Sequence, residues 1–288
     1  MAANAAVSSL ERLLTRDGII TIAGLFALWA LTCTYVVAGA GLGMSAWAMT
    51  QLALLPYQSG AMPASAMSSM PGMDMDSMAP AWDSGHWALM IAMWWTMMVA
   101  MMTPSAAPTI LLYARVHRQA RSAGQLQATG RSTAAFVAGY FFVWLVFAVA
   151  ATALHAWLEN AGIVAVETMG SQVRWLSGAT LIATGLYQLS PLKNSCLSQC
   201  RAPAQFLSRH WRPGSRGAFR LGLLHGGYCM GCCWMLMTLL FVGGVMNLVW
   251  IAALSLLVLA EKVLAAGRWV GYCAGIVLVA WGVLILSR

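Results

Sequence analysis

Seven long apolar stretches constrain the fold of this 288-residue chain more than any other feature of its sequence. A membrane-spanning helix needs about 20 mostly apolar residues. The stretches that approach or exceed this length run roughly over 18–41, 86–112, 132–158, 171–190, 218–242, 245–264 and 267–287. Because backbone polar groups in lipid must be satisfied within the segment, each stretch is expected to be a helix. With 60% apolar and only 8% charged residues, the chain lacks the charge that covers a soluble domain. The sequence predicts an all-α, polytopic transmembrane bundle of about seven helices.

The placement of positive charge predicts the orientation of this bundle. If the N-terminus is cytoplasmic, fourteen of the sixteen Lys and Arg residues fall on the inner side, and only Arg174 and Arg288 fall outside. This is the positive-inside bias, and it accounts for the net charge of +8 without a nucleic-acid partner. The first apolar stretch is longer than the roughly 7–15 residues of a signal-peptide core, so it is expected to remain as a helix. The predicted divisions are a cytoplasmic lead (1–17), helix 18–41, an outer loop (42–85) and a six-helix domain (86–288).

The outer loop is rich in methionine. Its centre, MSSMPGMDMDSM at 67–78, repeats methionine at nearly every second or third position, and it contains no Lys or Arg. Thioethers are soft ligands that suit Cu(I), and two or three can close on one ion from a flexible segment. The alternative is a Ser/Pro/Ala linker with incidental methionine. We interpret the loop as a weak metal-collecting segment whose candidate ligands are Met70, Met73, Met75 and Met78.

A second set of methionines follows in the stretch 86–112. His86, Met90, Met93, Met97 and Met101 are spaced by three or four residues, which places them along one face of a helix. At 1.5 Å per residue this stripe extends about 22 Å into the bilayer. Adaptable packing by methionine is the alternative. Because the stripe begins at a histidine beside the methionine-rich loop, we interpret it as a ladder of metal ligands.

The densest set of reactive side chains lies in HGGYCMGCCWMLM, at 225–237, inside the stretch 218–242. A polar cluster at this depth in lipid is costly and marks a functional site. At 100° per residue, His225, Cys229 and Cys232 fall within a sector of about 60°, with Cys233 about 80° from His225. One imidazole and three thiols predict a site for a soft ion, with Cu(I) preferred over Zn²⁺ and Ag(I) not distinguishable from Cu(I). Packing by small cysteines and a thiol–disulfide site at Cys229 and Cys232 remain alternatives.

Two further thiols lie in the predicted inner loop 191–217. Cys196 and Cys200 share one face if this segment is helical, so they could chelate one ion, and Lys193 and Arg201 would favour their thiolate forms. A pair of reduced thiols without a metal is the alternative reading of this weak motif.

Four other residues carry simpler expectations. His155, with Trp157 and Glu159, is expected to anchor a helix at the membrane interface, and a role as a ligand is the alternative. Lys262 is expected to snorkel to the inner surface, and Glu261 to form a structural ion pair with it or with an arginine of the inner loops. Assistance in proton or metal transfer is the alternative for Glu261.

Four blocks together resemble one bacterial family of predicted metal-binding integral membrane proteins. They are WWTMMVAMMTPSAAP (94–108), YQLSPLKNSCLSQCRAP (187–203), HGGYCMGCCWMLM (225–237) and EK (261–262). The family includes the membrane copper chaperone associated with polyphenol oxidase. The resemblance covers roughly residues 86–288, and it implies metal binding and copper provision, which we carry to His225, Cys229, Cys232 and Cys233.

These observations predict a copper-binding protein of the bacterial inner membrane that collects Cu(I) and delivers it to a copper enzyme or across the membrane. The expected partners are membrane lipid and a copper-dependent oxidase or metallochaperone. The alternative is an integral membrane oxidoreductase that uses the metal or the Cys229/Cys232 pair. The sequence carries neither CxxCH nor Rossmann glycines, which favours binding over turnover.

Overall fold

The computed structural model describes residues 16–42, 45–52, 82–122, 129–165 and 169–287, and this part of the chain is built from helices. The predicted all-α fold is confirmed. In chain order the elements are α2 (Arg16–Val37), α3 (Ala46–Leu52), α5 (Ser84–Ser122), α6 (Thr129–Asn160), α7 (Arg174–Leu189), α8 (Pro191–Arg201), α9 (Pro203–His210), α10 (Gly214–Thr238), α11 (Leu240–Gly243), α12 (Leu248–Val263) and α13 (Gly267–Ser287).

Five helical segments in the described residues are long and apolar enough to cross a membrane, so the chain is a multi-pass membrane protein. They are Ile19–Val37, Ser84–Gln119, Arg131–Asn160, Gly214–Gly243 and Gly267–Ser287. The other two predicted spans form α7 and α12, which have 16 residues each. At 1.5 Å per residue such a helix is about 24 Å long, shorter than the roughly 30 Å of a bilayer core.

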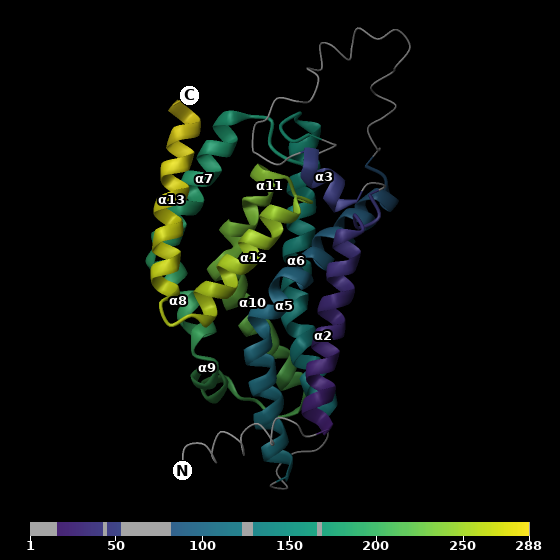
Figure 1. Cartoon of the computed structure of the whole chain (residues 1–288). Helices are drawn as coiled ribbons and strands as arrows, with labels where there is room; N and C mark the ends of the chain where they lie inside the picture. Colours follow the sequence, from purple (N-terminus) through teal and green to yellow (C-terminus); the bar gives the residue numbers. More distant parts are fainter. Residues whose placement is uncertain (1–15, 43–44, 53–81, 123–128, 166–168, 288) are drawn as a thin grey trace.

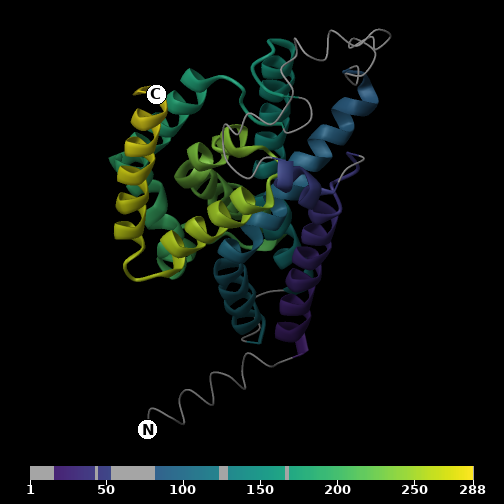
Figure 2. The ribbon, with the colours of Figure 1, turned by 45° about the horizontal axis from the view of Figure 1, so that its top comes forward.

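The helices form two packed groups, joined through α12 and through contacts of α7 with α8 and α10. In one group, α10 packs against α6 and α8, α5 packs against α6, and α2 packs against α5. In the other, α7 packs against α13. Figures 1 and 2 both place α2 on one side of the molecule and the α7–α13 pair on the opposite side, with α10 between them. α12 crosses obliquely and contacts both α13 and α5.

Small residues allow α6 and α10 to approach closely. A methyl group added at Gly222 would overlap the backbone carbonyl of Phe136, and one added at Gly226 would lie 3.0 Å from the carbonyl oxygen of Tyr140. Gly139 of α6 faces the backbone of Phe219 in the same way. Gly222 and Gly226 therefore allow the close approach of α6 and α10, whereas Gly227 has no atom near its added methyl group. Close helix approach through glycine is typical of membrane interfaces.

Local signals explain where three helices begin. The Asp83 carboxylate accepts a hydrogen bond from the His86 amide at the start of α5, and the Asn247 side chain accepts from Val249 and Trp250 at the start of α12. Ser190 ends α7 and caps α8, where Pro191 occupies the first turn. α5 continues through Pro104 and Pro108 and changes direction along its length (Figure 2).

Candidate metal centre

The reactive residues of α10 all face the interior of the protein. His225, Cys229, Cys232 and Cys233 are each at most 2% exposed. The Cys232 and Cys233 thiols both donate to the backbone carbonyl of Cys229, at 3.0 Å each. Burial extends beyond the sector expected from helical spacing, because α6 and α8 cover α10 from different sides.

Cys229 contacts two polar groups from other helices. Its sulfur lies 2.9 Å from Lys262 Nζ and 3.0 Å from the Tyr140 hydroxyl. Lys262 Nζ also donates to Ser105 Oγ of α5, at 3.2 Å. The prediction that Lys262 snorkels is wrong, because its ammonium group finds these partners inside the bundle. An ammonium and a phenol directed at one sulfur can stabilise negative charge on it, and the thiolate is the form that binds metals.

The thiols of α8 join those of α10, which sequence spacing did not reveal. Cys196 Sγ would lie 2.9 Å from a methyl group added at Gly231, and the Cys200 thiol is within hydrogen-bonding reach of Cys232. We call Cys196, Cys200, Cys229, Cys232 and Cys233 the thiol cluster. Nearby cations were expected to favour the thiolate in α8, but burial raises the pKa of Cys196, and a hydrogen bond with Cys232 together with burial raises the pKa of Cys200.

A buried ion pair holds α8 against α12. Lys193 Nζ lies 2.6 Å from Glu261 Oε2, both side chains are 2% exposed, and Gln188 Nε2 donates to Glu261 Oε1 at 2.8 Å. Glu261 therefore pairs with Lys193, and not with Lys262 or an arginine. The Tyr187 hydroxyl donates to the Gly231 carbonyl of α10. The adjacent residues Glu261 and Lys262 thus serve different neighbours, one holding α8 and the other contacting Cys229.

His225 lies one turn before Cys229 and is enclosed by aromatic rings. Its ring centroid is 5.3 Å from that of Phe206, 5.6 Å from Tyr140 and 6.1 Å from Phe136. Its Nδ1 is buried and has no hydrogen-bond partner among the described residues. A buried nitrogen without a partner is costly, so this ring has an unused ligand atom close to the thiol cluster.

Within the described residues, no group of three or more His, Cys, Asp or Glu side chains already has an arrangement that could hold a metal ion. The thiols of Cys232 and Cys233 are instead directed at a backbone carbonyl. Cu(I), which accepts two or three soft ligands, would require less rearrangement than a tetrahedral Zn²⁺ site.

The methionine stripe of α5 is also buried. Met90, Met93, Met97 and Met101 are at most 2% exposed, and so are Met98 and Met102, outside the predicted stripe. The stripe reaches the surroundings of the thiol cluster through Ser105, one turn after Met101, because Ser105 shares Lys262 with Cys229. The methionines assigned to the outer loop, Met70, Met73, Met75 and Met78, lie outside the described residues.

At the first turn of α5, His86 lies against Trp82, with ring centroids 4.7 Å apart. The Trp82 ring also lies 6.3 Å from that of His155 in α6. His155 is 1% exposed, so the prediction of an interface anchor is wrong for this residue, whereas Trp157 is 62% exposed. The i, i+4 spacing of His155 and Glu159 is the sequence signal that places their side chains on one face of α6.

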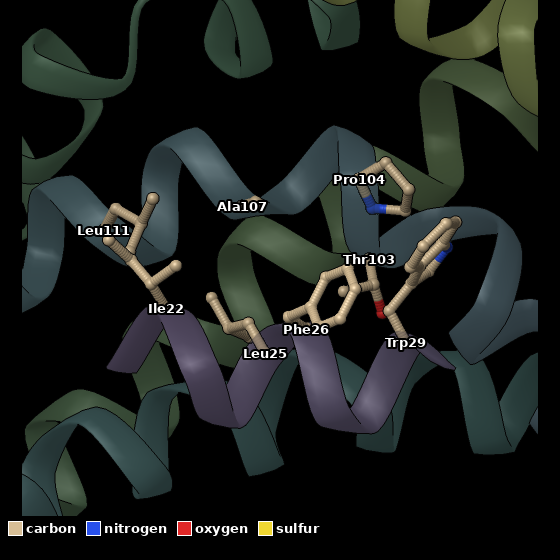
Figure 3. Close-up of a pocket in the computed structure, with 8 residues that line it drawn as sticks. All are labelled: Ile22, Leu25, Phe26, Trp29, Thr103, Pro104, Ala107 and Leu111. Carbon is tan, nitrogen blue, oxygen red and sulfur yellow. The ribbon is translucent and has the colours of Figure 1, made fainter. Parts of the chain in front are cut away.

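An apolar cavity of about 300 Å³ lies elsewhere, between α2 and α5. Figure 3 shows Phe26 and Trp29 of α2 facing the turn of α5 that contains Pro104. Apart from Thr103 its lining is hydrocarbon and aromatic, and none of the lining side chains contains sulfur or imidazole. The candidate metal ligands therefore lie outside the cavity.

Comparison with protein families identifies the chain. Residues 91–285 match the PpoB2 family model, described as a copper chaperone. No curated protein and no solved structure matches the chain. Because the matched region covers more than half of the sequence, the chain belongs to this copper chaperone family, and the resemblance inferred from its four sequence blocks is confirmed.

Proposed function

We propose that this multi-pass member of the copper chaperone family binds Cu(I) at the thiol cluster and delivers it to a copper enzyme. In the proposed orientation the N-terminus is cytoplasmic, in the bacterial inner membrane, and the loop 42–85 faces outwards. Copper would be collected by the methionines of this loop, pass along Met90, Met93, Met97 and Met101, and reach the thiols. Delivery across the membrane is the alternative fate of the ion.

The observation that carries this proposal is the convergence of thiols from α8 and α10. Cys200 lies beside Cys232, while Cys232 and Cys233 both contact the carbonyl of Cys229. Two or three thiolates match the softness and low coordination number of Cu(I). His225 Nδ1 supplies a further ligand atom.

Transfer also requires that the ion can leave. Cys229 is already contacted by Lys262 and Tyr140, so a departing copper ion would be replaced by existing partners instead of leaving a buried charge alone. Unpaired buried charges are strongly destabilising. These contacts therefore support an exchangeable site over a permanent one.

The oxidoreductase alternative is supported less well. Family membership favours copper transfer over turnover. Cys229 and Cys232 have the spacing of a redox pair, but the Cys232 thiol donates to the backbone carbonyl of Cys229.

The test is a competitive Cu(I) titration of the purified full chain against a colorimetric Cu(I) chelator. The variant C229S/C232S/C233S should lose at least about 100-fold in affinity, or about 2.8 kcal/mol. Cys200→Ser should weaken binding by about tenfold, because it removes one thiol contributed by α8. Cys273→Ser, at an exposed position of α13, is the matched control and should bind as the wild type. Wild-type affinity in the triple variant would refute the assignment.

A further inference from the structure

The proposed pathway leaves one buried histidine unexplained. His155 of α6 is 1% exposed, and neither of its ring nitrogens has a hydrogen-bond partner among the described residues. Each such nitrogen costs free energy when removed from water. A phenylalanine would fill the same space without this cost, so the imidazole indicates a role other than packing.

The surroundings of His155 combine aromatic walls with two possible ligands. The rings of Trp94 and Phe241 lie 6.3 and 5.7 Å from its own. Glu159 Oε2, one turn along α6, lies 3.9 Å from His155 Nε2. His86 is close enough to interact electrostatically with both His155 and Glu159, and Trp82 packs against both imidazoles.

Two imidazoles and one carboxylate form a harder ligand set than the methionines that follow on α5. Imidazole and carboxylate suit divalent copper, whereas thioethers select Cu(I). The carboxylate also offers a charge that would compensate a divalent cation in an otherwise apolar setting.

We infer that His86, His155 and Glu159, which lie near one another but would have to rearrange to coordinate an ion together, bind Cu(II) as a second metal site where α5 begins, beside the outermost methionine of the stripe. The site itself does not depend on the thiol cluster. The role of this site as the point of copper uptake rests on the proposed function. His86 lies one turn before Met90, the first methionine of the stripe. The purely structural alternative is that His155 is an aromatic spacer between Trp82, Trp94 and Phe241.

The experiment adds Cu(II) alone to the purified full chain and records electron paramagnetic resonance spectra through a titration. Cu(I) at the thiols gives no signal, so only divalent copper is observed. The wild type should bind Cu(II) with hyperfine coupling from two nitrogens. His155→Phe, which keeps an aromatic ring in place, should lose one nitrogen coupling and at least about tenfold in affinity.

Three further variants make the outcome decisive. His86→Ala should also lose one nitrogen coupling, and Glu159→Gln, which changes no volume in the core, should weaken binding by about tenfold even if His155→Phe does not fold. His210→Phe on α9 is the control and should bind as the wild type. Wild-type spectra and affinity in His155→Phe or Glu159→Gln would overturn the site, as would loss in His86→Ala alone. The C229S/C232S/C233S variant should retain the Cu(II) signal, which separates failure of this site from failure of the thiol cluster.

Discussion

The methionine stripe of α5 and the thiol cluster of α8 and α10 are both buried and rich in sulfur, but their surroundings differ. Both belong to the hydrophobic core, where the stripe packs among apolar side chains such as Trp94 and Met98. The cluster is bordered by an ammonium, a phenol and a buried ion pair. Neutral thioethers need no compensating charge, whereas thiolates do. Under the proposed function, this difference would suit the stripe to passage of an ion and the cluster to holding the ion until it is transferred.

The largest expected effect comes from removing the ion pair beside the cluster. Lys193→Met leaves Glu261 buried without its cation, which should lower the free energy of unfolding by about 3–5 kcal/mol. Thermal unfolding in detergent measures this loss. Adding Glu261→Gln should recover much of the stability, because no uncompensated charge then remains. A fully stable single variant would mean that this polar border does not support the cluster.

A smaller effect is expected from separating α10, which carries Cys229, Cys232 and Cys233, from α6. Gly222→Ala places a methyl group against the Phe136 carbonyl and should cost about 1–3 kcal/mol through overpacking. Gly227→Ala is the matched control, because its methyl group meets no atom and a helical Gly→Ala change gains up to about 1 kcal/mol. Equal melting temperatures for the two variants would argue against close α6–α10 packing as the support of the thiols.

The smallest equilibrium effect is expected in the stripe. Met97→Leu with Met101→Leu conserves volume, so each change should cost less than about 1.5 kcal/mol in stability, and Cu(I) affinity at the thiols should remain that of the wild type. The rate of Cu(I) loading, followed by stopped-flow chelator competition, should fall because two ligands on the route are gone. Unchanged loading would identify the stripe as packing only.

Much of this organisation could be predicted from local pattern. Apolar length predicts the membrane helices, and helical spacing predicts that His225, Cys229 and Cys232 share a face. The contribution of α8 could not be predicted, because it depends on how α7 and α8 break at Ser190 and return the chain to α10. The position of the Lys262 ammonium group could not be predicted either. A lysine near a helix end usually snorkels, whereas Lys262 contacts Ser105 and Cys229 inside the bundle. Contacts between distant segments leave no periodic signal in the sequence.

Copper K-edge X-ray absorption of the Cu(I)-loaded full chain tests the central claim most directly. The account predicts sulfur as the nearest scatterer in the wild type, and a changed first shell when Cys200, Cys229, Cys232 and Cys233 are replaced by serine. Replacement of Met97 and Met101 by leucine should leave that shell unchanged. A nitrogen or oxygen first shell in the wild type, or the same spectrum in the wild type and the four-serine variant, would contradict the claim that the thiol cluster holds the copper.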